Sequence, residues 1–182
     1  MEFVPTRIPD VVLVQPKVLG DRRGYFMETW QQDRFAAAGV PDRFVQDNHS
    51  RSGKHILRGM HYQVRQTQGK LVRVSRGSVF DVAVDMRRSS STFGQWVGFE
   101  LNDENHRMMW IPPGFAHGFL TLSDEVDFLY KCTDFYAPEY ERVLAWNDPS
   151  VGIEWPLPAG TTPTLAARDA VALGLHDIDA LP

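Results

Sequence analysis

Residues 70–86 read KLVRVSRGSVFDVAVDM, and this stretch decides the expected fold. Two runs rich in valine are separated by SRGS, whose residues are typical of a tight turn. Because successive side chains of a β-strand point to opposite faces, Lys70 shares a face with Val72, and Asp81 shares one with Ala83. The stretch therefore predicts two strands, each with a titratable side chain on an apolar face.

Other short runs rich in Val, Phe, Leu and Tyr are punctuated by turn residues. These runs predict strands at residues 95–102, 107–112, 118–122 and 126–136. Several strands at close spacing, without helices between them, favour a sandwich or barrel over a parallel α/β sheet. We expect an all-β jelly-roll sandwich with short flanking helices. The length suits one domain, placed at residues 1–182, with the segment from about 147 to 182 wrapping the barrel.

Helical patterns are scarce. QQDRFAAAGV, residues 31–40, predicts one short helix that Gly39 ends. TPTLAARDAVALGLHD, residues 162–177, predicts a second helix that begins after Pro163 and closes near Gly174.

Composition limits the classes of function. Hydrophobic residues make up 43% of the chain, enough for a sizeable core, and the net charge of −4 argues against nucleic-acid binding by bulk charge. No apolar run approaches the ~20 residues that span a bilayer, and the start MEFVPTRIPD lacks the pattern of a signal peptide. We expect a cytoplasmic protein without nucleic-acid or membrane partners. Cys132 is the only cysteine, so no internal disulfide can form.

A histidine interrupts the strand-like run ILRGMHYQ at residues 56–63. Strict alternation would place Gly59, His61 and Gln63 on one face of the strand and Arg58 on the other. A face that carries a histidine and an amide could serve a metal ion, a proton transfer or a hydrogen bond within the core.

The stretch IPPGFAHGF at residues 111–119 carries the pattern Pro-x-Gly-x-x-His, which delivers His117 onto a strand and resembles the second sequence motif of the cupin superfamily. In metal cupins the first motif supplies His-x-His and then a glutamate. Here Gln63 replaces the second histidine, and Lys70 stands where a carboxylate would be needed. A lysine ammonium has no lone pair to offer and repels a cation. We therefore predict no metal at this site.

Three polar groups on apolar strand faces have an ordinary alternative explanation. Lys70, Asp81 and Tyr130 could each be satisfied core groups, or could lie on strands whose other face forms the core. Burying a charge costs several kcal/mol unless it is paired. Together in one barrel, these groups favour a polar cup that binds a small molecule.

Eight blocks of sequence follow one another along the chain: GDRRGYFMETW, FVQDNHS, LRGMHYQ, QGKLVRV, GSVFDVAVDMRRSSSTFGQWVG, WIPPGFAHGF, FLYKCTDFYAPEYER and WNDPSVGIEWP. In register and in the same order, these blocks resemble the dTDP-4-dehydrorhamnose 3,5-epimerases, which are metal-free cupins. The resemblance runs from about residue 5 to about residue 170 and implies an isomerase of dTDP-L-rhamnose biosynthesis, without a cofactor, that serves lipopolysaccharide or cell-wall polysaccharide.

The resemblance implies four catalytic residues. His61 matches the base, Asp169 the carboxylate that orients it, Tyr130 the proton donor on the opposite face of the sugar, and Lys70 the residue near the C4 oxygen. Substrate-contacting positions are implied for Arg23, Glu28, Gln46, Asp47, Asn48, Arg58, Lys70, His117, Tyr136, Glu141 and Arg168.

Further details also follow from the resemblance. Tyr136 matches the aromatic residue that stacks on thymine, and Asp81 is expected to partner His117 inside the barrel. The family often reads Ser-x-Lys-Asp at its C-terminal site, whereas this chain reads AARD, in which Arg168 keeps the positive charge.

The resemblance also implies a homodimer in which an N-terminal strand pairs onto the other subunit. Arg23 and Glu28 are then expected to serve the neighbouring site. Arg23 and Arg58 can hold a pyrophosphate, because the guanidinium group binds phosphate oxygens through paired N–H groups.

The residues agree with this chemistry. A ketone at C4 acidifies the C–H bonds at C3 and C5, and a histidine of pKa ~6.5 can act as a base near neutrality. Four alternatives remain open: an epimerase acting at one centre, a ketoisomerase of modified sugars, a non-catalytic jelly roll that binds sugar nucleotides, and a metal cupin oxygenase.

Overall fold

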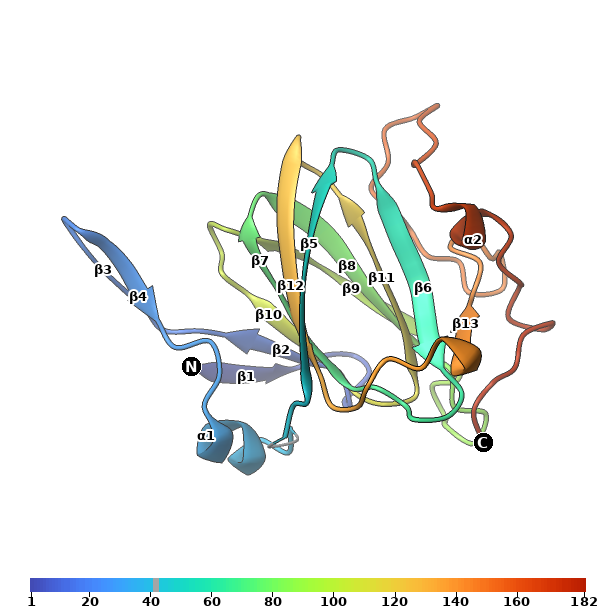
Figure 1. Ribbon diagram of the computed structural model, residues 1–182, viewed down its shortest axis with the longest axis horizontal. Helices are drawn as coiled ribbons and strands as arrows, with labels where there is room; N and C mark the ends of the chain where they lie inside the picture. The colour runs from blue at the N-terminus through green and yellow to red at the C-terminus, as the bar shows by residue number, and fades with distance from the viewer. Residues whose placement is uncertain (41–42) are drawn as a thin grey trace.

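The computed structural model describes residues 1–40 and 43–182 (Figure 1). Its elements in chain order are β1 (Glu2–Pro5), β2 (Val12–Gln15), β3 (Val18–Asp21), β4 (Gly24–Met27), α1 (Gln32–Ala37), β5 (Gln46–Gly53), β6 (Leu57–Gln63), β7 (Lys70–Arg76), β8 (Ser78–Asp85), β9 (Trp96–Asn102), β10 (Met108–Ile111), β11 (Phe115–Thr121), β12 (Glu125–Cys132), the 3₁₀ turn η1 (Pro138–Tyr140), β13 (Glu141–Val143) and α2 (Ala167–Ala170).

Two sheets pack face to face as a jelly-roll sandwich (Figure 1). One sheet has the order β1-β2-β10-β7-β12-β5, and the other has the order β13-β6-β11-β8-β9. Every strand pair within these two sheets is antiparallel. The all-β jelly-roll prediction is therefore confirmed, and the strands predicted on either side of the SRGS turn are β7 and β8.

The main hydrophobic core fills the space between the sheets. Val72 and Val74 of β7 lie in it together with Val79 and Ala83 of β8, as alternation predicted. These side chains are at most 2% exposed. The polar residues that share their faces, Lys70 and Asp81, are consequently carried into the interior.

Two predicted strand boundaries were wrong. β12 ends at Cys132, whereas the sequence predicted a strand through residue 136, and β11 begins at Phe115 rather than at residue 118. Beyond Cys132 the chain no longer pairs as a strand, and side chains bind several of its backbone groups; Gln46 Oε1, for example, accepts the Tyr136 N–H at 3.0 Å.

The first predicted helix is confirmed as α1, and Gly39 follows it with a φ of +75°, which favours glycine. The second is much shorter than predicted, because only Ala167–Ala170 is helical. The backbone on both sides of α2 pairs with residues next to β6 and β13: Thr164 forms a parallel bridge with Ile56, and Leu173 forms one with Leu144. Within the described ranges, no helix is long and apolar enough to cross a membrane.

The C-terminal segment lies against the outer face of the five-stranded sheet (Figure 1). Val151, Leu175, Ile178 and Leu181 pack there in a second hydrophobic cluster with side chains of β6, β8 and β11. This packing brings α2 alongside β6, where the polar groups of the site gather.

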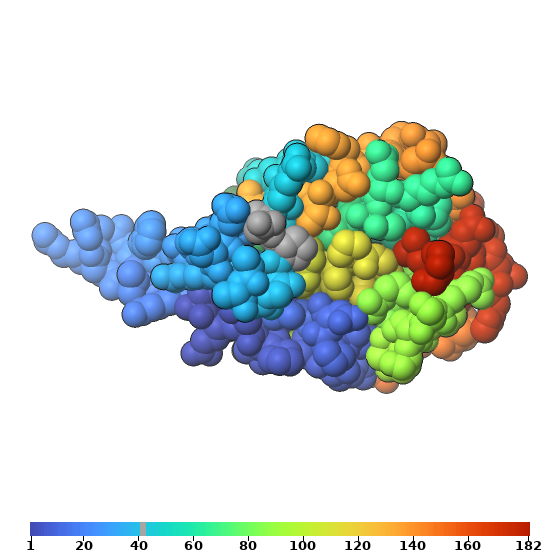
Figure 2. Space-filling view, turned by 90° about the horizontal axis from the view of Figure 1, so that it is seen from below, coloured from blue at the N-terminus to red at the C-terminus, as the bar shows by residue number. Residues whose placement is uncertain are grey.

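The β3–β4 hairpin projects away from the sandwich (Figures 1 and 2). It carries large apolar side chains in exposed positions: Leu19 is 54% exposed, Tyr25 57% and Phe26 69%. Exposed apolar surface of this kind is typical of an interface with another chain.

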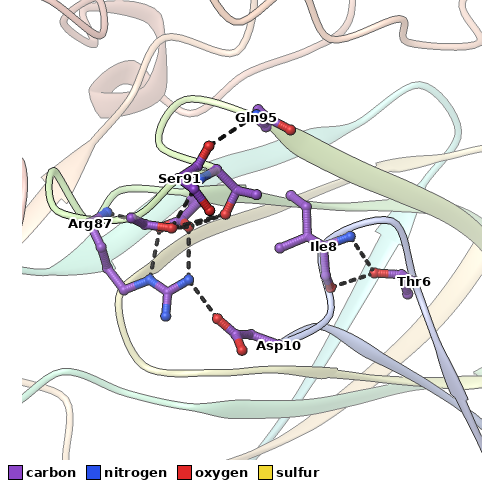
Figure 3. A network of polar contacts seen from close by, with 9 residues as sticks. Thr6, Ile8, Asp10, Arg87, Ser91 and Gln95 are labelled. Atoms are coloured by element: carbon purple, nitrogen blue, oxygen red, sulfur yellow. Dashed lines mark hydrogen bonds and ion pairs between the residues drawn. The ribbon is translucent and has the colours of Figure 1, made fainter.

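A polar network ties the N-terminal loop to the loop between β8 and β9 (Figure 3). Buried Asp85 accepts hydrogen bonds from Arg87 Nε (2.9 Å), Ser90 Oγ (2.6 Å) and Thr92 Oγ1 (2.7 Å), and Arg87 Nη2 also binds Asp10 at 2.7 Å. Burial disfavours the charged carboxylate, but the hydrogen bonds outweigh burial and lower the pKa of Asp85 to about 2.

This shift predicts how stability depends on pH. Because the folded pKa of Asp85 lies below its unfolded value, the ionised side chain stabilises the fold above about pH 4, and this stabilisation is lost as the pH falls towards 2. Asp85→Asn should lower the free energy of unfolding by about 2 kcal/mol at pH 7 and by much less at pH 2.5. Urea unfolding at both pH values measures the difference. Asp124→Asn, at an exposed position, is the control, and an equal loss at both pH values would contradict the prediction.

Candidate active site

A histidine–carboxylate pair joins the barrel to the C-terminal segment. His61 Nε2 on β6 lies 2.7 Å from Asp169 Oδ1 on α2, and Asp169 Oδ2 accepts the Gly59 N–H at 3.3 Å. Asp169 is 2% exposed. Burial raises its pKa, but the hydrogen bond and charge of His61 and the Gly59 N–H outweigh burial, so the pKa of Asp169 lies below its ordinary value. An ionised carboxylate only accepts, so Nε2 carries the proton and Nδ1 is the free basic nitrogen.

A bulge in β6 corrects the predicted facing of Arg58. His117 on β11 pairs with His61, whereas Phe119, two residues later, pairs with Arg58, three residues earlier, so β6 holds one extra residue. Gly59 lies in this bulge with a φ of +138°. Strict alternation placed Arg58 opposite His61, but both side chains line the same pocket.

Lys70 lies beneath the histidine. It begins β7, its side chain is buried, and its Nζ donates to the His61 carbonyl oxygen at 3.3 Å. Burial lowers the pKa of Lys70 from its ordinary value, and the negative charges of Glu141 and Asp81 act in the opposite direction. The Lys70 amine lies in a largely dry setting, where charge interactions are strong.

Tyr130 on β12 faces the pocket from the other sheet. Its neighbours across the strands are Val72 on β7 and Asn48 on β5. Burial raises the pKa of Tyr130, so the phenol keeps its proton at neutral pH and can donate it.

A second histidine–carboxylate pair lies deeper in the barrel. His117 Nε2 is 2.9 Å from Asp81 Oδ2, as expected from the sequence, and both residues are buried. Burial lowers the pKa of His117 and raises the pKa of Asp81. The His117 ring stacks against Phe128 with the ring centroids 6.0 Å apart.

One pocket collects all four predicted catalytic side chains, together with Arg58, His117 and Arg168 of the predicted binding residues. It is lined by Ser50, Arg58, His61, Lys70, His117, Phe119, Tyr130, Ala166, Arg168 and Asp169. At its rim, Arg168 Nη1 binds Glu141 Oε2 at 2.6 Å, and Tyr136 Oη donates to the same oxygen at 3.3 Å. Arg168, which stands where the family often has lysine, thus keeps a positive charge in the pocket wall.

Other predicted site residues lie outside this pocket. Asp47 points to the opposite face of β5 from Gln46 and Asn48, and its carboxylate binds Lys131 at 2.6 Å. Gln46 Nε2 donates to Asn48 Oδ1 at 3.0 Å, beside the segment that carries Tyr136.

The two remaining predicted residues belong to the projecting part of the chain. Arg23 lies on the β3–β4 hairpin, bound to Asp21 at 2.6 Å, and Glu28, just after the hairpin, lies 3.2 Å from Arg34. Within one chain, neither side chain lines the pocket.

Sequence reasoning did not identify several supporting residues. Ser50, Phe119 and Ala166 line the pocket, and Ser52 Oγ accepts the Nε–H of Arg58 at 3.0 Å. Alternation along QDNHSRS could have indicated Ser50 and Ser52, because they share the face of Asn48.

Gln63 does not turn its carboxamide towards His61. The amide binds backbone groups of Gln66, Phe135 and Ala137 instead. Across residues 1–40 and 43–182, no three His, Cys, Asp or Glu side chains gather in a way that could hold a metal ion.

Comparison with known proteins places this site in a family. The family model described as dTDP-4-dehydrorhamnose 3,5-epimerase matches residues 5–177. The dTDP-4-dehydrorhamnose 3,5-epimerase of Pseudomonas aeruginosa is 57% identical over 183 residues, which covers 100% of both chains.

Solved structures agree with this comparison. A dTDP-6-deoxy-D-glucose-3,5-epimerase from Legionella pneumophila in complex with dTDP-4-keto-L-rhamnose superposes with a TM-score of 0.94 at 52% identity, covering 98% of this chain and 94% of that one. A 3'-monoepimerase from Streptomyces bikiniensis in complex with dTDP-quinovose gives 0.88 at 32% identity, covering 94% and 87%. With its jelly-roll fold and its pocket built on His61 and Asp169, the chain belongs to the dTDP-4-dehydrorhamnose 3,5-epimerase family of isomerases.

Proposed function

We propose that this protein inverts C3 and C5 of dTDP-4-dehydro-6-deoxy-D-glucose to give dTDP-4-dehydro-L-rhamnose. The observation that carries the proposal is the His61–Asp169 pair, which opens on the same pocket as Lys70 and Tyr130. The reaction moves two protons and requires no change of oxidation state, so we propose that it uses no cofactor and no metal.

His61 is the proposed base. Its Nδ1 removes the proton at C3 or C5, which the C4 ketone makes acidic. Asp169 fixes the tautomer through Nε2 and stabilises the imidazolium that forms. A general base supplies only ~10²–10⁴-fold of rate enhancement, so the negative charge that develops on the C4 oxygen needs its own partner.

Lys70 is the proposed partner of that oxygen. Its ammonium group is buried beside the pocket and held by the His61 carbonyl. A cation fixed in a dry site stabilises an enolate without reorganising at the moment of reaction. His117 adds a polar lining below it, held by Asp81.

Tyr130 is the proposed acid. It faces the pocket from the six-stranded sheet, whereas His61 faces it from the five-stranded sheet. Removal of a proton from one side of the sugar ring and return of a proton from the other side inverts the carbon centre. The raised pKa of Tyr130 keeps the proton available.

The rim is the proposed site for the nucleotide. Arg58 and Arg168 offer guanidinium groups to the pyrophosphate, which guanidinium groups bind in a bidentate way. Tyr136 offers its ring to the planar base. Gln46, which also binds Asn48, accepts the Tyr136 N–H, and Glu141 accepts the Tyr136 hydroxyl. Asp47 is proposed to contact the substrate through its backbone, because its carboxylate binds Lys131.

A homodimer is the proposed assembly. The projecting hairpin exposes Leu19, Tyr25 and Phe26 and carries Arg23 away from its own pocket (Figure 1). Docking of the hairpin onto a second copy would bury these side chains and bring Arg23 and Glu28 to the neighbouring site. We place this enzyme in the cytoplasm, where its product would supply L-rhamnose for lipopolysaccharide or cell-wall polysaccharide.

Proton exchange tests the function directly. In D₂O, the enzyme should convert dTDP-4-dehydro-6-deoxy-D-glucose with deuterium entering at both C3 and C5, as followed by NMR. His61→Asn should abolish inversion and exchange, because it removes the base. Deuterium at one position alone would indicate an epimerase acting at a single centre, like the Streptomyces relative. Binding of the substrate without any exchange would indicate a non-catalytic binding protein.

Tyr130→Phe should separate proton removal from inversion. The variant keeps the ring, so its packing near Phe128 survives, and His61 can still form the enolate. The proton then returns mainly from His61 with retention. Deuterium should enter unreacted substrate while the doubly inverted product falls by about 10²-fold or more. NMR measures both, and inversion at the wild-type rate would assign Tyr130 to packing alone.

Removal of metal should have no effect. Gln63 and Lys70 stand where metal cupins have ligands, and the Gln63 amide is engaged by backbone groups. We expect unchanged kcat after exhaustive EDTA treatment and gel filtration. Loss of activity that one divalent ion restores would contradict this prediction and favour a metal cupin.

Mixing two defective variants tests the dimer. Alone, Arg23→Ala should be weakly active and His61→Asn should be inactive. In a mixed dimer, the pocket with intact His61 receives Arg23 from its partner, so co-refolded mixtures should recover about one quarter of wild-type activity. If each pocket instead used the Arg23 of its own chain, the mixture would recover no activity, and the prediction would be contradicted.

A further inference from the structure

Gln63 ends β6 two residues after His61, yet it does not line the pocket. Its side chain is buried, with the residue 4% exposed. Nε2 donates to the Gln66 carbonyl at 2.7 Å and to the Phe135 carbonyl at 3.2 Å, and Oε1 accepts the Ala137 N–H at 2.9 Å. All three partners are backbone groups, so the carboxamide acts as a clamp between two loops.

Two of the residues that Gln63 binds, Phe135 and Ala137, lie on either side of Tyr136. Residues 133–137 leave β12 without forming a strand or helix, so their backbone groups need partners from elsewhere. Gln63 holds Phe135 and Ala137, and Gln46 Oε1 holds the N–H of Tyr136 itself at 3.0 Å. Two amides from the barrel strands β5 and β6 thus bind three consecutive residues of an otherwise irregular segment.

The side chain at the centre of this segment is exposed, although its backbone is fixed. Tyr136 is 48% exposed, and its hydroxyl donates to Glu141, which binds Arg168 of the pocket wall. The ring is therefore held at both ends. A surface fixed before binding loses little conformational entropy when a planar ligand stacks on it.

We propose that Gln63 is a positioning residue for nucleotide binding: its carboxamide fixes residues 135–137 so that the ring of Tyr136 forms a rigid platform for the base of the substrate. This proposal rests on the proposed function, because it deepens the role of the rim in that reaction. Gln63 acts through Tyr136 and touches neither the sugar nor the reacting atoms.

The primary test is the affinity of Gln63→Met for dTDP, measured by isothermal titration calorimetry. The variant keeps the length of the side chain but removes all three hydrogen bonds. We expect dTDP to bind about tenfold more weakly, because the stacking of the base on the ring of Tyr136 is weakened but not removed. KM should rise by a similar factor, whereas kcat and the rate of deuterium exchange at saturating substrate should stay within about twofold of wild type.

Gln15→Met is the matched control. Gln15 Nε2 also donates to a loop carbonyl, that of Asn105 at 3.1 Å, but neither residue lines the pocket. This variant should bind dTDP as wild type does. Equal weakening in both variants would mean a general loss of stability and would overturn the proposal.

A double-variant cycle tests whether Gln63 affects dTDP binding through Tyr136. Tyr136→Ala removes the platform, so adding Gln63→Met to it should weaken dTDP binding no further. Independent, multiplicative losses would overturn the proposal. The wild-type exchange experiment stands apart from this cycle: its failure would reject the epimerase function, whereas the cycle concerns dTDP binding alone.

Gln63→Glu provides a second route if Gln63→Met does not fold. The carboxylate can still accept the Ala137 N–H, but it faces the carbonyl oxygens of Gln66 and Phe135, whereas a protonated carboxyl can donate to one of them. Relative to wild type at each pH, dTDP binding by Gln63→Glu should be weaker at pH 8 than at pH 5.5. A ratio independent of pH would overturn the proposal.

Discussion

The close approach of Gly59 and Gly118 is the constraint on which the site depends. A Cβ added to Gly59 would lie 2.5 Å from Gly118 Cα, and one added to Gly118 would lie 2.8 Å from the Arg58 carbonyl oxygen. Only two glycines allow β6 and β11 to meet in this way. The resulting bulge turns Arg58 to the side of His61, and the Gly59 N–H helps to hold Asp169. The position of the His61–Asp169 pair therefore depends on this backbone geometry.

Burial of charge is the second requirement. Lys70, Asp81 and Asp169 are at most 7% exposed, and unpaired charges in such positions cost several kcal/mol. Each has a partner: Lys70 binds a backbone carbonyl, Asp81 binds His117, and Asp169 binds His61. These partners offset the cost of burial and fix polar groups around the pocket in which we propose that an enolate forms.

The molecule divides its tasks between rigid and irregular parts. The two sheets hold His61, Lys70 and Tyr130, which are proposed for proton transfer, and α2 adds Asp169. The segment at residues 133–137, the α2 region and the hairpin supply Tyr136, Arg168 and Arg23, which are proposed for the nucleotide. Amide side chains such as Gln63 connect the two parts, because an irregular segment needs hydrogen-bond partners that its own backbone does not provide.

The sequence by itself determined the all-β class, the alternating faces of β7 and β8, the short helix α1 and the candidate residues His61, Lys70, Tyr130 and Asp169. These follow from patterns of period two, from turn residues and from blocks that resemble a known family. Only the tertiary structure decided what depends on contacts distant along the chain. The bulge at Gly59 reversed the facing of Arg58. The short second helix lies between Thr164 and Leu173, whose backbone pairs with Ile56 and Leu144. Beyond β12, the amides of Gln46 and Gln63 bind the backbone of residues 135–137. Local propensity cannot predict these features, because in each case the deciding partner lies elsewhere in the chain and meets the segment only after folding.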